Sequence, residues 1–140
     1  MKERIDLFTD ASLRDGDGFA IAASITYFTT DGERKTISFS SYYDKEIKST
    51  KAEYIAIVFG IEKAYKKCPS PGDHRLVINS DCQYAVNKLR DSAKEYEDNL
   101  DRIARKYMDC FNSFATYHID RGINGHADSI ARSTLDKHNE

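Results

Sequence analysis

The chain has 140 residues, of which 40% are hydrophobic and 31% are charged, a balance typical of a folded protein and not of a disordered one. The formal net charge of −2 argues against a protein that depends on bulk electrostatic attraction to nucleic acid or to an anionic membrane, although a local basic groove is compatible with it. Three cysteines, Cys68, Cys82 and Cys110, are widely spaced, so we expect neither a zinc site nor a disulfide framework.

The N-terminal residues MKERIDLFTD contain no apolar stretch of the kind found in signal peptides. No apolar run elsewhere approaches the length that spans a membrane. We therefore expect a cytoplasmic protein whose residues 1–140 form one domain.

The first third of the chain carries three strand signals in succession. Residues 4–12 alternate between apolar and polar side chains, residues 19–30 are rich in β-branched and aromatic side chains, and residues 34–43 follow as a third strand. A glycine- and aspartate-containing turn is expected at 14–18, and the pair Asp31-Gly32 is a strong hairpin signal. The three strands should form an antiparallel meander.

The remaining elements alternate between helices and strands. A helix is predicted at 49–67, capped by Ser49 or Thr50 and ending before Pro69, with a loop at 68–73 and a strand at 74–80. Helices at 82–90 and 91–112, a strand at 113–120 and a helix at 124–138 capped by Asn124 complete the order. Because helical crossovers join parallel strands, the fold class should be α/β. We expect a mixed five-stranded sheet, three strands antiparallel and two parallel, flanked by helices.

Four acidic residues occupy places where an acid is unusual. Asp10 ends the first strand and Asp81 ends the fourth, so parallel neighbours would bring both carboxylates to one edge of the sheet. Two more acids lie on the apolar faces of helices: Glu53 with Ala56, Ile57, Gly60 and Ala64, and Asp128 with Ala131 and Leu135. Convergence of these elements would gather all four carboxylates at one place.

Each acid alone has an ordinary structural explanation. An acid that follows a strand is usually a turn or cap residue, and an acid in the first turn of a helix favours the helix dipole. Together they are harder to explain, because an ionised carboxylate that faces a core is costly unless it is paired or bound to metal. We expect no basic residue on the same stripes, so divalent cations are the favoured partners.

Four segments resemble, in order, the motifs of the ribonuclease H family, type 1 branch. They are TDAS at 9–12, STKAEY at 49–54, VINSDCQYAVNKL at 77–89 and RGINGHADSIA at 121–131. Cys82 stands where the family has a serine. The resemblance covers nearly the whole chain, and the motifs fall on the secondary structure expected for them.

The resemblance implies an RNase H-like fold and a function. Asp10, Glu53, Asp81 and Asp128 would be the catalytic and metal-binding residues, holding two Mg²⁺ ions that Mn²⁺ could replace. The implied activity is a two-metal endonuclease that cleaves the RNA strand of an RNA–DNA hybrid and leaves a 5′-phosphate. Ser49, Thr50 and Arg121 would contact the hybrid. Residues 120–123 (DRGI) are too few for the histidine-bearing loop of many relatives, so the chain resembles the shorter branch.

Some features depart from the family pattern and leave alternatives open. The chain has no tryptophan and no lysine-rich protrusion. Other basic residues could contact phosphates or could simply form a solvated helix face: Lys88, Arg90, Lys94, Arg102, Arg105 and Lys106. His126 lies two residues before Asp128, so on a helix the two should not face one site. The alternatives are a binding module with the same fold, or a nuclease acting on DNA or structured RNA.

Overall fold

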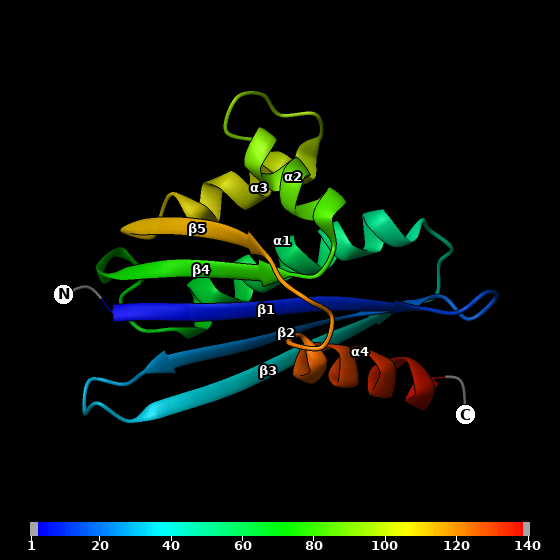
Figure 1. The fold of residues 1–140 in the computed structure, drawn as a ribbon, viewed down its shortest axis with the longest axis horizontal. Helices are drawn as coiled ribbons and strands as arrows, with labels where there is room; N and C mark the ends of the chain where they lie inside the picture. The colour runs from blue at the N-terminus through cyan, green and yellow to red at the C-terminus, as the bar shows by residue number, and fades with distance from the viewer. Residues whose placement is uncertain (1–2, 139–140) are drawn as a thin grey trace.

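The computed structural model describes residues 3–138 and contains a mixed five-stranded sheet with helices on both faces (Figure 1). The strands are β1 (Glu3–Leu13), β2 (Phe19–Phe28), β3 (Arg34–Tyr43), β4 (His74–Ser80) and β5 (Ser113–His118). Their order across the sheet is β3-β2-β1-β4-β5. The β1–β2 and β2–β3 pairs are antiparallel, whereas β4 runs parallel to β1 and β5 parallel to β4. The expected fold class is confirmed.

Both turns of the antiparallel meander depend on glycine. Gly32 has a φ of +82° in the turn between β2 and β3, as the Asp31-Gly32 signal indicated. Gly18 has a φ of +78°, and a Cβ atom there would lie 2.3 Å from the carbonyl oxygen of Tyr43. Only glycine satisfies both the backbone angle and the close approach of β3.

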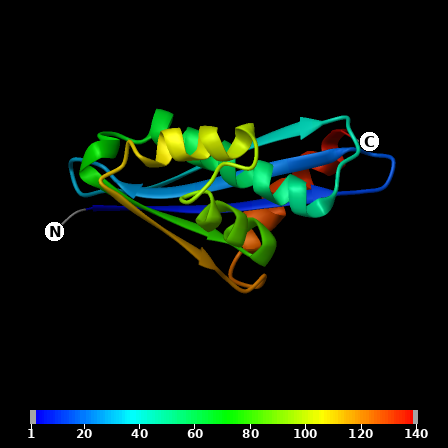
Figure 2. The ribbon, with the colours of Figure 1, turned by 90° about the horizontal axis from the view of Figure 1, so that it is seen from above.

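The helices divide between the two faces of the sheet (Figures 1 and 2). Helix α1 (Ser49–Lys67) crosses one face, with α2 (Gln83–Asp91) and α3 (Asn99–Met108) beside it, while α4 (Gly125–His138) packs on β1, β2 and β3 from the other face. Alternation along β1 explains the larger core, because Ile5 and Leu7 are fully buried toward Ile57 and Ile61 of α1. A short 3₁₀ helix, Pro71–Asp73, precedes β4.

The predicted helix at 91–112 is too long at both ends, because α3 starts only at Asn99 and already ends at Met108. The side chain of Asp98 accepts a hydrogen bond from the backbone N–H of Asp101, which makes Asp98 the N-cap. The carboxylate of Asp101 accepts from the backbone N–H of Glu97 at 2.8 Å. These side chain–backbone bonds replace helical ones and hold residues 93–98 outside the helix.

A buried polar network joins α3 to α1 and α2. Asp101 is 1% exposed and accepts a hydrogen bond from the hydroxyl of Tyr54, and the ammonium of Lys88 lies 3.5 Å from its carboxylate. Burial raises the pKa of Asp101, but the hydrogen bonds from Tyr54 and Glu97 and the charge of Lys88 outweigh it, so the pKa lies below its ordinary value. Asp101 is therefore a paired structural acid, unlike the acids of the site below.

Within residues 3–138, no helix is long and apolar enough to cross a membrane.

Candidate active site

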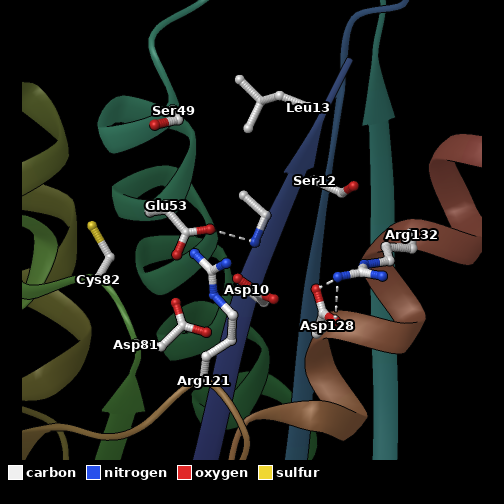
Figure 3. Close-up of a pocket in the computed structure, with 11 residues that line it drawn as sticks. Asp10, Ser12, Leu13, Ser49, Glu53, Asp81, Cys82, Arg121, Asp128 and Arg132 are labelled. Atoms are coloured by element: carbon white, nitrogen blue, oxygen red, sulfur yellow. Dashed lines mark hydrogen bonds and ion pairs between the residues drawn. The ribbon is translucent and has the colours of Figure 1, made fainter.

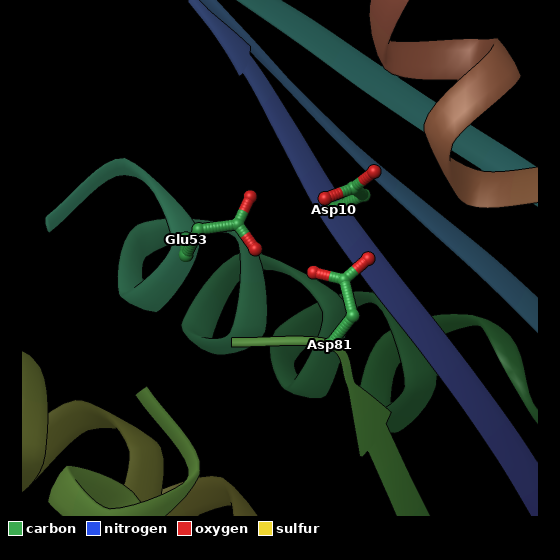
Figure 4. Close-up of side chains that lie close together, drawn as sticks. All are labelled: Asp10, Glu53 and Asp81. Carbon is green, nitrogen blue, oxygen red and sulfur yellow. The ribbon is translucent and has the colours of Figure 1, made fainter. Parts of the chain in front are cut away.

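Three of the four acids singled out in the sequence meet at one edge of the sheet. Asp10 lies near the end of β1, Asp81 directly follows β4, and Glu53 lies in the second turn of α1. One carboxylate oxygen from each lies within 4.8 Å of the others (Figure 4). The expected convergence of Asp10, Glu53 and Asp81 is thus confirmed by the geometry.

Strand register and a glycine produce this convergence. The parallel pairing of β1 with β4 ends at Thr9 opposite Ser80, so Asp10 and Asp81 both follow the last pair. A Cβ atom on Gly60 of α1 would lie 2.8 Å from side-chain atoms of Leu7 and Thr9, so the missing side chain lets the helix approach β1 closely. Two turns before Gly60, Glu53 reaches the strand and accepts a hydrogen bond from the backbone N–H of Ala11 at 2.7 Å.

Asp128 lines the same cavity but stands outside the cluster of three acids. It lies in the first turn of α4, and the guanidinium of Arg132 contacts its carboxylate at 3.2 Å (Figure 3). The expectation that no basic residue shares the stripes of the acids is therefore wrong for Asp128. Arg132 is four residues further along the same helix, and that spacing was readable from the sequence.

The surroundings of Glu53 and Asp10 disfavour the ionisation of these two carboxyl groups. Burial raises the pKa of Glu53 well above its ordinary value, and the negative charges of Asp10 and Asp81 raise it further. Burial also raises the pKa of Asp10, while the hydrogen bond that it shares with Glu53 lowers it and the charge of Asp81 raises it. Without a cation, the protein therefore holds protons at this site that an exposed carboxylate would release.

The acids line an open cavity of about 480 Å³ (Figure 3). Ser49 and Arg121, both expected to contact substrate, line it, whereas Thr50 does not. Neither Ser49 nor Thr50 caps α1, because Lys48 is the N-cap residue and Ser49 already belongs to the helix. Ser12, Leu13, Cys82 and Arg132 also line the cavity and were not predicted to do so. Ser12 and Leu13 follow Asp10 in the sequence, Cys82 follows Asp81, and Arg132 lies one helical turn after Asp128. This nearness to the predicted acids is the only sequence signal that could have indicated them.

Most of the basic residues on α2 and α3 contact the protein itself. Lys88 pairs with Glu97, Asp98 and Asp101, while Arg90 donates to the carbonyl of Thr116. Arg102 donates to Asn99, and Arg105 donates to Ser92 and to the carbonyl of Leu89. Arg90 and Arg102 are exposed nonetheless, so a contact of these residues with phosphate stays a prediction.

The two histidines nearest the site in sequence differ in position. Nε2 of His126 lies 3.4 Å from the hydroxyl of Ser38, and the ring lines a separate cavity beside β2 and β3, as its spacing from Asp128 indicated. His118 is exposed at the end of β5, and its Nε2 lies 3.1 Å from the backbone carbonyl of Asp81. A carbonyl can only accept, so Nε2 is the donor.

Asn124 has a different role from the cap that was predicted. It directly precedes α4, but its side-chain amide donates to the carbonyl of Thr9 at 2.8 Å and to Oδ2 of Asp81 at 3.1 Å. Its side-chain oxygen has no hydrogen-bond partner among the residues that the structure describes. The asparagine was correctly predicted to precede the helix, but its side chain bonds Thr9 and Asp81 and does not cap α4.

Comparisons with known proteins agree with the fold. The family model described as "Reverse transcriptase-like" matches residues 8–134. No curated protein sequence matches significantly.

Several solved structures are similar across the whole fold. RNase H1 from the archaeon Halobacterium salinarum is 19% identical with a TM-score of 0.68, covering 96% of this chain and 98% of that one. An N-terminal RNase H domain from Mycobacterium tuberculosis is 16% identical with a TM-score of 0.73, covering 98% and 96%. LC11-RNase H1, isolated from compost by a metagenomic approach and solved in complex with an RNA/DNA hybrid, is 20% identical with a TM-score of 0.71, covering 98% and 100%. The TM-scores show that these proteins share the fold, and at identities this low the similarity shows no more than the fold.

Proposed function

We propose that this chain, which belongs to the ribonuclease H family, is a metal-dependent endonuclease that cleaves the RNA strand of RNA–DNA hybrids and leaves 5′-phosphates. The observation that carries the proposal is the approach of Asp10, Glu53 and Asp81 to within 4.8 Å of one another, in an open cavity that Asp128 also lines. Within residues 3–138, Asp10, Glu53 and Asp81 form no ion pair, and three such carboxylates gathered at the carboxyl ends of parallel strands are an arrangement that stability alone does not favour.

The donor set fits Mg²⁺ or Mn²⁺. All of the side chains concerned offer hard carboxylate oxygens. Burial first, and the neighbouring carboxylates second, raise the pKa of Glu53, so a bound cation would relieve an unfavourable negative charge there. Asp10, Glu53, Asp81 and Asp128 would hold the two cations that the family resemblance implies. When bound, such cations would activate a water molecule and stabilise the leaving oxygen of a phosphodiester. Glu53 and Asp10 would lose their protons on binding.

Substrate contacts are proposed for the residues at the rim of the cavity. Arg121 is exposed beside the acids, and its guanidinium can bind a phosphate with two hydrogen bonds (Figure 3). The hydroxyl of Ser49 lies on the opposite side of Glu53 and can contact a 2′-hydroxyl, the group that distinguishes RNA from DNA. Thr50, predicted to contact the hybrid with Ser49, does not line the cavity, so we propose no contact for it inside the cavity.

The contacts that Lys88, Arg90 and Arg105 make within the protein bear on its affinity for nucleic acid. Phosphate contacts supply most of the affinity for nucleic acid and all of its salt dependence. Because three acids neutralise Lys88, and backbone carbonyls hold the guanidinium groups of Arg90 and Arg105, we expect the enzyme to bind a hybrid weakly, with a shallow dependence on salt.

The decisive experiment is cleavage of end-labelled RNA–DNA, RNA–RNA and DNA–DNA duplexes in Mg²⁺ or Mn²⁺. We expect cleavage of the RNA strand of the hybrid. Asp10→Asn should lower the rate by about a hundredfold or more, exceeding the about ten- to hundredfold typical of a residue that only supports a metal ligand. Asp6→Asn is the matched control, because Asp6 lies on the same face of β1 but pairs with Arg4 outside the cavity.

Other results would assign the protein differently. Cleavage of RNA–RNA or DNA duplexes alone would make it a nuclease with another substrate. Hybrid binding without metal-dependent cleavage would make it a binding module. A cytoplasmic location, expected from the sequence, remains a prediction that cell fractionation can test.

A further inference from the structure

The side chain of Asn124 joins the two strands that carry acids. It is 1% exposed, and its Nδ2 donates to the backbone carbonyl of Thr9 and to Oδ2 of Asp81, at 2.8 and 3.1 Å. Both partners are oxygens that accept hydrogen bonds, and an amide nitrogen carries two protons. The orientation of the amide is therefore fixed by the chemistry of its neighbours.

The two acceptors lie where the sheet no longer holds the strands together. Pairing between β1 and β4 ends at Thr9 opposite Ser80, and Asp10 and Asp81 are the residues that follow this last pair in the chain. Asn124 bridges this gap, because it binds the residue before Asp10 through the backbone and binds Asp81 through the carboxylate. The separation of the two acids thus depends on a residue from a third element.

The contact with Asp81 also fixes how that carboxylate is turned. One oxygen, Oδ2, is engaged by the amide, so the plane of the group and the direction of the other oxygen are set. The backbone of the same segment is held separately, because Nε2 of His118 donates to the carbonyl of Asp81 and the N–H of Ile119 donates to Ser80 at 2.9 Å. The end of β5 therefore holds Asp81 at its backbone, and the turn before α4 holds it at its side chain.

We propose that Asn124 is a positioning residue that sets the orientation of Asp81 and its spacing from Asp10 for a divalent cation. The inference rests on the proposed function, since it assigns Asn124 a role in the metal affinity of the same site. A partner that orients a metal-binding carboxylate typically accounts for about ten- to hundredfold in metal affinity. Asn124 does not touch the reacting atoms, so it would act through Asp81.

A purely structural role is the competing explanation, and Asn79 provides the control for it. Asn79 of β4 is 7% exposed, and its Nδ2 donates to the backbone carbonyl of Leu7 at 3.2 Å; Leu7 lies on β1, as Thr9 does. It therefore resembles Asn124 in burial and in its bond to β1, but that bond lies outside the acid cavity. Loss of either amide leaves a carbonyl of β1 without that donor, which lowers stability in both cases.

The experiment compares Asn124→Ala and Asn79→Ala with the wild-type protein. Mn²⁺ affinity is measured by calorimetry without nucleic acid, alongside the melting temperature with a chelator and the kcat and KM for an RNA–DNA hybrid. We expect both variants to melt at a lower temperature. Only Asn124→Ala should bind Mn²⁺ about ten- to hundredfold more weakly, with a reduced kcat that recovers at high Mn²⁺ and an unchanged KM.

Asn124→Ser covers the case in which the alanine variant does not fold. A hydroxyl has one proton and cannot donate to Thr9 and Asp81 together, so Mn²⁺ affinity should fall in this variant as well. Wild-type Mn²⁺ affinity in a folded Asn124 variant, or an equal loss in Asn79→Ala, would overturn the inference. A wild-type protein that neither binds Mn²⁺ nor cleaves any duplex would instead overturn the proposed function, and the inference with it.

Discussion

At the scale of single residues, the clustered acids oppose the folding of the metal-free protein. Burial first, and mutual repulsion second, raise the pKa values of Glu53 and Asp10 above their ordinary values. A carboxyl group whose pKa is raised by folding favours the folded state below its unfolded pKa and loses that contribution as the pH rises through the folded value. The site should therefore weaken the metal-free protein progressively from about pH 4 upward.

We predict that Glu53→Gln flattens this dependence. With a chelator present, the melting temperature of the wild-type protein should fall between about pH 5 and about pH 8, and the variant should show a smaller fall. Glu62→Gln is the control, because Glu62 lies on the same helix and pairs with Lys66 at the surface, 3.2 Å away. Identical slopes for wild type and Glu53→Gln, measured by circular dichroism, would contradict the assigned electrostatics.

A second prediction concerns His126. Its ring faces Ser38 and lines the cavity beside β2 and β3, not the cavity of the acids. His126→Ala should keep single-turnover cleavage within about tenfold, since loss of a general acid or base typically costs about 10²–10⁴-fold. A hundredfold loss at saturating Mg²⁺, in a variant with an unchanged circular dichroism spectrum, would show that His126 does reach the reacting groups.

At the scale of elements, the close approach of α1 to β1 is the most sensitive contact. An alanine at position 60 would bring a Cβ atom to 2.8 Å from side-chain atoms of Leu7 and Thr9. Overpacking of this kind costs about 1–3 kcal/mol, whereas replacing a helical glycine by alanine returns about 1 kcal/mol. Gly60→Ala should therefore lower the free energy of unfolding by up to about 2 kcal/mol.

The same change should weaken metal binding. Glu53 lies seven residues before Gly60, about 10 Å along the helix axis, so an outward shift of α1 carries its carboxylate away from Asp10. Urea denaturation and Mn²⁺ titration of the Gly60→Ala variant test the two effects separately. A variant that is as stable as the wild type would show that Leu7 and Thr9 yield without moving the helix.

The elements also show what the sequence could and could not predict. Strands and helices were predictable where their apolar periodicity was strong, as in β1, β2 and α1, and the helical crossover implied the parallel pairing that brings Asp10 and Asp81 together. The start of α3 was missed, because the side chain–backbone bonds of Asp98 and Asp101 override a helical spacing that begins only at Leu100. The amide contacts of Asn124 were not predictable, because they join residues 115 and 43 positions apart.

At the scale of the whole molecule, cation binding and folding should be coupled. The acids come from β1, α1, the end of β4 and α4, so only the folded chain gathers them. Mg²⁺ or Mn²⁺ should raise the melting temperature of the wild-type protein, by an amount that grows with the logarithm of cation concentration above the dissociation constant. The increase should shrink in Glu53→Gln, and equal increases in both proteins would indicate a non-specific ionic effect.

The single-domain organisation of residues 1–140 remains a prediction. It can be tested in the same melting experiments, because one domain of this size usually unfolds in a single cooperative transition. The calorimetric and van't Hoff enthalpies should then agree. Two transitions, one of which is insensitive to the cation, would show that part of the chain folds independently of the site.

The contacts of Asn124 with Thr9 and Asp81 have a consequence for the biosynthesis of the protein. A nascent chain synthesised as far as Asn112 already contains Asp10, Glu53 and Asp81, together with the residues of the first four strands. It lacks β5 and α4, however, and with them the amide that orients Asp81. On the proposed function, a chain still being translated would be a poor nuclease, and its activity would appear only after α4 has docked.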